Sequence, residues 1–207
     1  MEPSEELQTK WVVFTGPPCS GKTTCLKRLE RDYGYEWIPE QARCLVEQRL
    51  TAGESLDSIR RGNAEKKFQN DVWKLKVEVE SHLEKDQVYL LDRALPDSLA
   101  YARVLGMTGN DSQSFAAGCK RRRYASPVFF FEEIPSDALP QNAFRDGVRI
   151  EQRTEVQCLS QALLDVYGDL GYTIFHVPFA SVDDRVALIL QELKRQDLFP
   201  SASTETH

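Results

Sequence analysis

Residues 16–23 read Gly-Pro-Pro-Cys-Ser-Gly-Lys-Thr and fit the phosphate-binding pattern G-x-x-x-x-G-K-[ST]. The glycines let the backbone approach phosphate oxygens that a Cβ atom would keep away. Backbone N–H groups then converge on the anion at the start of a helix, where the helix dipole favours negative charge. The lysine supplies a positive charge for the β- and γ-phosphates, and the threonine hydroxyl is suited to bind Mg²⁺.

The flanking sequence favours this interpretation over a chance match to the pattern. Residues 11–15 form a short apolar run rich in β-branched and aromatic side chains, which is typical of a buried strand. Residues 24–31 place Leu26 and Leu29 among polar residues, as at the start of a helix. A strand, a glycine loop and a helix in this order are what the motif requires. We expect ATP to contact Gly16, Ser20, Gly21, Lys22, Thr23 and Thr24.

A second set of chemically capable residues begins at Asp92. It ends the apolar run at residues 87–92, which predicts a strand that finishes in a carboxylate. In P-loop proteins a carboxylate at such a position holds Mg²⁺, directly or through water. Surface aspartates are common after strands, so the signal depends on the glycine loop. Together they predict a Mg²⁺ site formed by Thr23 and Asp92.

The order of motifs resembles the ribosylnicotinamide-kinase-like family of AAA-type P-loop ATPases and kinases. Residues 92–101 also resemble the Asp-Arg segment of thymidylate-kinase-like enzymes. The likeness spans about residues 10–195 and implies a P-loop kinase fold with ATPase or small-molecule kinase activity, without naming the substrate. The motifs that carry it are residues 16–23, Pro39-Glu40-Gln41-Ala42-Arg43, Leu91-Asp92-Arg93 with Asp97, and Asp146-Gly147-Val148-Arg149.

The stretch around Glu40 is similar to deoxynucleoside kinases, in which a glutamate after the second strand is the general base. The resemblance implies that Glu40 takes the proton of an attacking hydroxyl while Arg93 orients it. Arg43, one helical turn later, would face the same pocket. The alternative is that Glu40 caps the helix that follows it, since acidic residues favour the first turn. Whether Glu40 or Asp92 is the base stays open.

Two further residues are candidates for the acceptor side. Asp97 and Tyr101 lie four residues apart, so they share one face of the expected helix. They follow the Asp-Arg pair closely, which would bring them to the same pocket. The predicted acceptor side then comprises Glu40, Arg43, Arg93, Asp97 and Tyr101.

Three arginines, Arg145, Arg149 and Arg153, recur at intervals of four residues. In nucleoside and nucleotide kinases a segment after the fourth strand closes on the phosphates with arginines, and the resemblance implies this role here, with Arg149 and Arg153 foremost. The planar guanidinium binds phosphate oxygens in pairs and stabilises charge that develops in the transition state. The alternative is an exposed basic helix face that pairs with Glu151 and Glu155.

Apolar runs alternate with amphipathic segments along the whole chain. The alternation predicts an α/β protein, a three-layer α/β/α P-loop NTPase fold with a five-stranded parallel sheet. We expect one domain over residues 1–207, with a core at about 10–196 and polar tails. Strands are expected at residues 11–15, 36–39, 87–92, 128–131 and 173–177. Helices are expected at or through residues 24–31, 41–50, 64–85, 99–104, 112–123, 150–167 and 181–195.

The connecting segments are predicted from their polarity. Residues 1–9 are expected to be a polar lead-in, residues 53–63 a polar connection and residues 132–148 a long loop. The basic cluster at residues 120–123 is typical of an exposed helix end, although it could also serve an acidic partner. The long helix carries an apolar stripe that is expected to pack into the core, formed by Phe68, Val72, Leu75, Val79 and Leu83.

Composition narrows the class of protein. The chain has 207 residues, 41% of them hydrophobic, which is enough for one domain with a full core. The net charge of -6 argues against nucleic acid as the main partner. No apolar run reaches the length of about 18 residues that a membrane span needs, and the acidic N-terminus has no apolar signal core. The five scattered cysteines indicate a reducing cytoplasm and neither zinc nor disulfides.

Two functions fit these observations. The first is an ATP- and Mg²⁺-dependent kinase that phosphorylates a small-molecule acceptor, a metabolite or nucleoside-like compound. The second is a regulatory P-loop ATPase or nucleotide switch that acts through a protein partner. A Ras-like switch is disfavoured because no Asn-Lys-x-Asp guanine motif occurs and no glycine follows Asp92 as in the usual switch. The sequence leaves a homodimer open.

Overall fold

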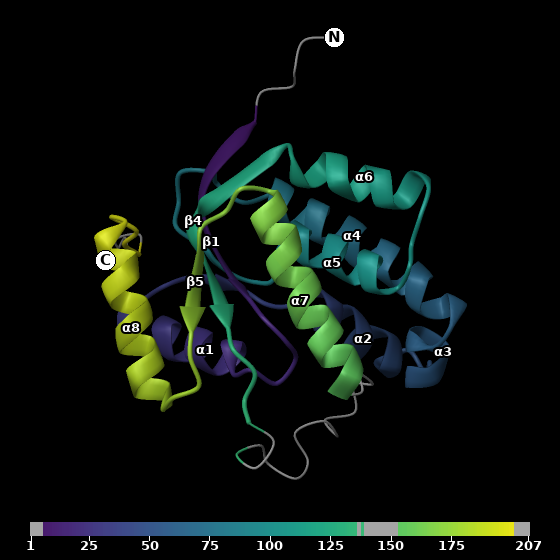
Figure 1. Cartoon of the computed structure of the whole chain (residues 1–207), viewed down its shortest axis with the longest axis horizontal. Helices are drawn as coiled ribbons and strands as arrows, with labels where there is room; N and C mark the ends of the chain where they lie inside the picture. The colour runs from purple at the N-terminus through teal and green to yellow at the C-terminus, as the bar shows by residue number, and fades with distance from the viewer. Residues whose placement is uncertain (1–5, 136–137, 139–152, 201–207) are drawn as a thin grey trace.

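The computed structural model describes residues 6–135, 138 and 153–200, with the side chains of residues 153 and 154 excluded. Within them, five parallel strands form one sheet in the order β2-β3-β1-β4-β5 (Figure 1). This confirms the predicted five-stranded parallel α/β sheet. The strands are β1 (Leu7–Thr15), β2 (Trp37–Ile38), β3 (Leu90–Asp92), β4 (Arg122–Phe131) and β5 (Ile174–Val177).

Helices cover both faces of the sheet, as a parallel sheet requires (Figure 1). On one face lie α1 (Lys22–Tyr33) and α8 (Val182–Arg195). On the other lie α4 (Asn63–Ser81), α5 (Leu95–Val104), α6 (Asn110–Cys119) and α7 (Arg153–Asp169). Two shorter helices, α2 (Gln41–Thr51) and α3 (Leu56–Arg60), pack against α4 around a small core of their own.

Strand β1 is the centre of the fold and pairs with both β3 and β4. Its side chains alternate between the two layers, so that Trp11 and Val13 join the core under α5 and α7. Val12 and Phe14 join the core under α1 and α8. Since both faces of the strand are buried, a continuous apolar run is the sequence that fits it.

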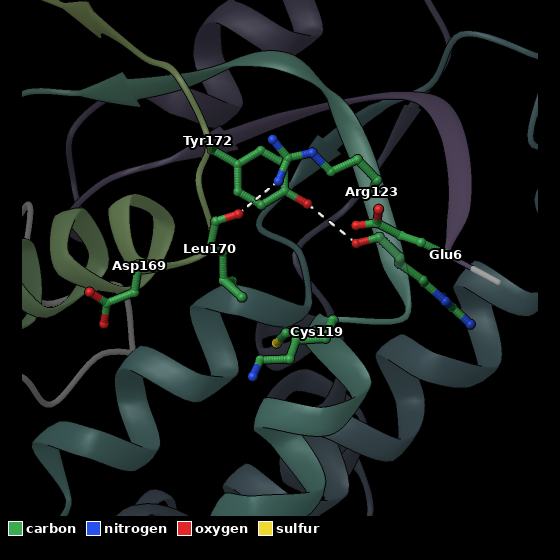
Figure 2. A pocket seen from close by; sticks show the side chains of 8 residues that line it. Glu6, Cys119, Arg123, Asp169, Leu170 and Tyr172 are labelled. Carbon is green, nitrogen blue, oxygen red and sulfur yellow. Dashed lines mark hydrogen bonds between the residues drawn. The ribbon is translucent and has the colours of Figure 1, made fainter. Parts of the chain in front are cut away.

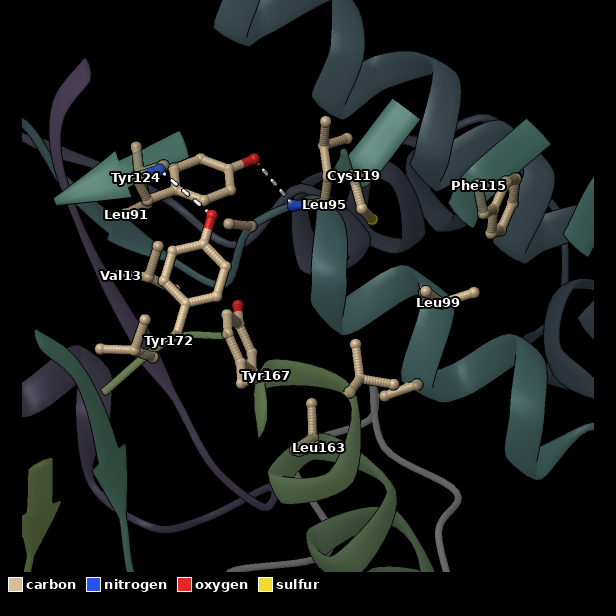
Figure 3. Close-up of a cluster of buried hydrophobic side chains, with 14 of the residues drawn as sticks. Val13, Leu91, Leu95, Leu99, Phe115, Cys119, Tyr124, Leu163, Tyr167 and Tyr172 are labelled. Carbon is tan, nitrogen blue, oxygen red and sulfur yellow. Dashed lines mark hydrogen bonds between the residues drawn. The ribbon is translucent and has the colours of Figure 1, made fainter. Parts of the chain in front are cut away.

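The larger core contains three tyrosines that connect the sheet with α5 and α7 (Figure 3). The Tyr124 backbone N–H donates to the hydroxyl of Tyr172, and the Leu95 N–H donates to the hydroxyl of Tyr124. The hydroxyl of Tyr167 donates to Asp97, 2.7 Å away. The hydroxyls of these three tyrosines are therefore paired, and one of the pairs reaches the candidate site.

The sequence-based prediction was wrong at the start of β1 and at the start of β4, where the two strands pair with each other. Leu7 and Gln8, expected in a polar lead-in, are in β1 and pair with Arg122 and Arg123 of β4. Those arginines, expected at a helix end, are strand residues because α6 ends at Cys119. Each segment is too polar to indicate a strand alone. The partner that completes the pairing lies more than a hundred residues away in the sequence.

The apolar stripe predicted for helix α4 is confirmed only in its first part, where Phe68 and Val72 are buried. Leu75 and Val79 of the predicted stripe are only half-buried, whereas Trp73, Lys76 and Glu80 are buried. Lys76 and Glu80 can be buried because residues of other elements supply their partners. The helix also ends at Ser81 rather than at residue 85.

A short helix, α3, occupies the segment predicted as a polar connection. Ser55 caps it by accepting a hydrogen bond from the backbone N–H of Ser58, and Ile59 and Arg60 are buried. Two serines at cap spacing are the local signal for this helix. None of the helices in the described part of the chain combines the length and apolar character needed to cross a membrane.

Candidate functional site

The glycine loop lies between β1 and α1, at the end of the sheet where the strands finish. Gly16 has φ +132°, and a Cβ atom there would lie 2.4 Å from the carbonyl oxygen of Phe131 in β4. Gly21 has φ +85° and precedes the first residue of α1. Both values lie in the region that favours glycine, so the loop's shape depends on these two positions. Strands β2 and β3 lie on one side of β1 and strands β4 and β5 on the other, and ligands bind at such a reversal of strand order in open α/β sheets.

Lys22 is folded back over this loop. Its Nζ donates to the carbonyl oxygens of Pro17 at 2.8 Å and Gly16 at 3.2 Å, and to the hydroxyl of Ser20 at 3.1 Å. Burial, followed by the positive charge of Arg93, lowers the pKa of Lys22 to about 7, although nearby carboxylates oppose the shift. These three hydrogen bonds of the Lys22 ammonium group all go to uncharged oxygens, so an anion can take their place.

Thr23 and Asp92 meet as predicted. The Thr23 hydroxyl donates to Oδ2 of Asp92 at 2.6 Å, and Asp92 is 1% exposed. Its Oδ1 has no hydrogen-bond partner among the described residues. Burial and the charge of Glu40 raise the pKa of Asp92. A hydroxyl and a carboxylate with a spare buried oxygen fit Mg²⁺, which uses one or two carboxylates together with substrate phosphates.

No richer metal-binding group competes with this pair in the described ranges. A cluster of three or more His, Cys, Asp or Glu side chains is absent from residues 6–135, 138 and 155–200. A site built for zinc would need such a cluster. The donor set at Thr23 and Asp92 is therefore more suitable for magnesium.

Arg93 contacts two residues of the predicted acceptor side, Glu40 and Asp97. Its backbone is in the left-handed region at φ 69°, uncommon for a side chain of this size, and its N–H donates to the Phe14 carbonyl at 3.0 Å. The buried guanidinium donates through Nε to Glu40 at 2.8 Å and through Nη1 to Asp97 at 3.0 Å. Two carboxylates thus hold the side chain while the β1 backbone holds the main chain.

Glu40 precedes α2 without capping it. Its side chain makes no cap hydrogen bond to the first turn of the helix, so the capping alternative is not supported. The carboxylate instead accepts from Arg93, and 18% of the side chain remains exposed. The short strand β2 positions it, because Ile38 is paired with Leu91 directly before Asp92 in β3. The structure therefore brings Glu40, Arg93 and Asp92 to one edge of the sheet.

Asp97 is better placed to position Arg93 than to bind an acceptor. It is fully buried, and four donors use its carboxylate. The Thr15 hydroxyl and Arg93 Nη1 donate to Oδ1 at 2.7 and 3.0 Å. The Ala94 N–H and the Tyr167 hydroxyl donate to Oδ2 at 2.9 and 2.7 Å. The predicted substrate contact at Asp97 stays untested, and these hydrogen bonds favour a positioning role instead.

The other two acceptor-side candidates, Tyr101 and Arg43, make different contacts. Tyr101 is near Arg93, whose guanidinium carbon lies 5.7 Å from the centre of the tyrosine ring. The Arg43 side chain is 41% exposed and donates to Glu47 on its own helix at 2.9 Å. Tyr101 therefore remains a candidate on geometry, whereas the contact seen for Arg43 is an ordinary one along the surface of α2.

The predicted phosphate-closing arginines fall largely outside the described residues. Arg145 and Arg149 lie outside them, and Arg153 begins α7 with a side chain that is not described. The prediction that these residues contact phosphate is untested. The long loop at residues 132–148 falls mostly outside the described part as well.

Arg185 of α8 was missed at the sequence level. It is buried against the glycine loop and donates through Nη1 to the Ser20 carbonyl at 2.9 Å. The signal was its position four residues before Ile189, which places a charge on the apolar stripe of an amphipathic helix. A charged residue in that stripe needs a specific partner in the fold.

A separate pocket of about 160 Å³ lies at the other end of the sheet, near the start of β4 (Figure 2). There the Arg123 guanidinium stacks on Tyr172 at 4.1 Å and donates to the carbonyl oxygens of Leu170 and Gly171, both at 2.7 Å. Arg122 pairs with the buried carboxylate of Glu80. Both arginines therefore already bind groups of the protein, and we assign no ligand to this pocket.

Comparisons with known proteins agree with this geometry. A family model described as an AAA domain matches residues 11–185. No curated protein sequence matches the chain significantly. A solved deoxyadenosine kinase from M. mycoides, with the products dCMP and dCDP, is 15% identical with a TM-score of 0.65; the match covers 89% of this chain and 98% of the kinase.

Two further solved structures have the same fold. Thymidylate kinase from Candida albicans is 14% identical with a TM-score of 0.61, over 92% of this chain and 93% of that enzyme. The NadR protein in complex with NAD and AMP-PNP is 16% identical with a TM-score of 0.62, over 91% of this chain and 49% of NadR. The chain therefore belongs to the matched AAA domain family and has the fold of P-loop nucleoside and nucleotide kinases.

Proposed function

We propose that the protein is an ATP- and Mg²⁺-dependent kinase that transfers the γ-phosphoryl group of ATP to a hydroxyl of a small, nucleoside-like metabolite. One observation carries the proposal. A buried arginine, Arg93, holds the partly exposed carboxylate of Glu40 beside the phosphate loop and Asp92. Plain nucleotide hydrolysis needs the loop and the metal site, whereas a second oriented carboxylate suits an acceptor that must be positioned and deprotonated.

The donor half of the site is formed by the loop. Lys22 exchanges its contacts with the Gly16 and Pro17 carbonyls for contacts with the β- and γ-phosphates. Thr23 and Asp92 would hold Mg²⁺, which neutralises phosphate charge when bound. The loop's backbone N–H groups and the start of α1 orient the phosphate chain.

The acceptor half depends on Glu40. As the acceptor oxygen bonds to the γ-phosphorus and the bond from the γ-phosphorus to the bridging oxygen breaks, Glu40 takes the hydroxyl proton and ADP leaves. Glu40 is the stronger candidate than Asp92, because Asp92 is buried and already accepts a hydrogen bond from Thr23. Arg149 and Arg153 are proposed to close on the phosphates and stabilise the transferring group.

The relatives suggest where to look for the acceptor. The solved kinases with this fold are described as acting on deoxyadenosine and thymidylate, and NadR is solved with NAD. A nucleoside-like acceptor is therefore the first class to test. All five cysteines are free, which supports a reducing compartment such as the cytoplasm as the place of the reaction.

The test is a screen of purified protein with Mg²⁺ and ATP against nucleosides, nucleotides, sugars and guanidino compounds. ADP release and the phosphorylated product are both measured. One acceptor should raise ADP release well above the slow basal rate. If none does, the kinase proposal fails and a regulatory ATPase that acts through a partner becomes the better explanation.

Two variants assign the roles once an acceptor is found. Lys22→Ala should abolish turnover. Glu40→Gln should lower the rate of transfer by about 100-fold or more while ATP affinity stays within a factor of about two. The matched control is Glu47→Gln on the same helix, whose carboxylate pairs with Arg43. Full activity in Glu40→Gln would show that the base is another residue.

A further inference from the structure

Arg185 is a buried cation with very little compensation. The residue is 6% exposed, its Nη1 donates to the Ser20 carbonyl at 2.9 Å, and its Nε is buried without a hydrogen-bond partner. Among the described residues no carboxylate forms an ion pair with it. The buried arginines Arg60 and Arg93, by contrast, pair with Glu65, Glu40 and Asp97.

An unpaired charge in this position destabilises the ligand-free protein. Removal of a guanidinium from water costs free energy that only an anion or several hydrogen bonds can offset. A buried lysine can lose its proton, but arginine stays charged under all conditions that proteins experience. Stability of the protein without nucleotide therefore does not explain why an arginine occupies position 185.

The surroundings of the guanidinium identify that reason. It packs directly on Gly21, where a Cβ atom would lie 2.7 Å from Nη1 and 2.9 Å from Nη2. Gly21 is the residue before α1, so Arg185 lies against the outer side of the loop whose N–H groups face the phosphates. The carbonyl of Ser20, which accepts from Arg185, belongs to the same loop.

We propose that Arg185 is a positioning residue for nucleotide phosphates. It holds the Ser20–Gly21 backbone in the conformation that binds an anion, and its positive charge is balanced when phosphates occupy the loop. The role rests on the proposed nucleotide binding and adds a second cation, supplied by the last helix, to the one supplied by Lys22. Gly21, whose φ of +85° already favours glycine, leaves the space that the guanidinium occupies.

The proposal predicts opposite effects on binding and on stability. Arg185→Met keeps much of the side-chain volume and removes the charge. It should weaken the binding of ATP and of inorganic tripolyphosphate by about tenfold, with a smaller loss for AMP, because the effect grows with phosphate charge. The ligand-free variant should unfold at the same urea concentration as the wild type or at a higher one. Arg185→Lys, which keeps the charge, should recover part of the affinity.

Isothermal titration with the three ligands and urea denaturation without ligand measure these effects. Arg195→Met is the control, because it removes the same charge from the same helix at a side chain that is 67% exposed and pairs with Glu192. It should bind ATP like the wild type. A purely structural Arg185 would give the reverse pattern, with lower stability and unchanged affinity for tripolyphosphate, and that result would overturn the proposal.

The same titrations separate this inference from the proposed function. If the wild type binds ATP and Arg185→Met binds it equally well, only the role of Arg185 is wrong. If the loss of affinity is equal for AMP and ATP, the charge of Arg185 does not act on the phosphate chain and the proposal is also wrong. If the wild type binds neither ATP nor tripolyphosphate, the nucleotide function itself fails.

Discussion

At the scale of a residue, the burial and the hydrogen bonds of Lys22 explain why the glycine loop favours an anion. The ammonium group is buried on three oxygens of its own loop and has a pKa of about 7. A bound anion stabilises such a lysine in two ways. It pairs with the positive charge, and it favours the protonated form of the amine. Arg93, the second largest cause of the low pKa, is itself held by Glu40 and Asp97.

This state predicts proton uptake on nucleotide binding. At about pH 8, where nucleotide phosphates are ionised, Lys22 is largely neutral in the free protein and should take up a proton when ATP binds. ATP affinity should therefore fall as the pH rises above about 7. Titration calorimetry in buffers of different ionisation enthalpy measures the uptake, with EDTA present to exclude metal at Asp92.

Lys22→Met is the control for this experiment and should show no uptake. The same shift fixes the sign for stability: between pH 7 and the pKa of an unfolded lysine, the unfolded chain holds a proton that the folded chain has lost. The free energy of unfolding should therefore rise with pH over that range in the wild type. Binding without proton uptake at pH 8 would contradict the low pKa.

Helix α5 joins the parts of the site at the scale of elements. Its first turn carries Asp97, which binds Thr15 at the end of β1, Arg93 after β3, and Tyr167 of α7. Lys76 of α4 donates to the Ala94 carbonyl at 2.8 Å and thereby ties another helix to the same turn. Arg93 is thus fixed by a junction of two strands and three helices.

Asp97→Asn should disrupt this junction. Burial alone would raise the pKa of Asp97, but Lys76, Arg93 and the Tyr167 hydroxyl outweigh it and lower the pKa. Loss of the charge removes one of the carboxylates that compensate the buried cations Lys76 and Arg93, so the free energy of unfolding should fall by about 3–5 kcal/mol at neutral pH. Urea denaturation measures it.

Measurements at acid pH and a milder variant, Tyr167→Phe, test whether the charge of Asp97 stabilises the fold. Because the pKa of Asp97 is lowered in the folded state, its stabilisation is present above about pH 4 and is lost as the pH falls through the folded value. The difference between wild type and Asp97→Asn should therefore narrow in acid. Tyr167→Phe removes one of the four hydrogen bonds and should cost about 2 kcal/mol. A constant difference down to acid pH would show that the charge of Asp97 is not what matters.

At the scale of the whole molecule, two large cores lie on the faces of one sheet, and a smaller core lies under α2, α3 and α4. The glycine loop is in contact with several of these parts. Gly16 lies against Phe131 of β4, and Ser20 and Gly21 lie against Arg185 of α8. A ligand in the loop should therefore stabilise the domain as a unit.

Thermal unfolding tests this unity. We expect one transition, coincident by circular dichroism and tryptophan fluorescence, as for a single cooperative domain. Mg²⁺-ATP at about 100 times its dissociation constant should add about 2.7 kcal/mol and raise Tm by about 5–10 °C, and Lys22→Ala should abolish the shift. A second transition whose midpoint temperature does not change with ATP would show that the small core around Val46 and Phe68 unfolds independently.

The sequence by itself determined the order of elements and the local structure around the glycine loop. Residues 11–33 contain a strand, a glycine loop and a helix whose signals are local: an apolar run, glycines at fixed spacing and a hydroxyl after a lysine. Asp92 and Arg93 could be predicted because they end an apolar strand. Local signals suffice here because phosphate binding uses consecutive backbone N–H groups.

The tertiary structure alone decided which charged residues are buried and what they contact. Asp97 has the sequence pattern of a pocket residue, yet four donors from distant segments occupy its oxygens. Leu7 belongs to β1 only because Arg122 is beside it, and Arg185 reaches the loop across 165 positions of sequence. Burial of a charge depends on partners that the fold brings together, and no local pattern contains that information.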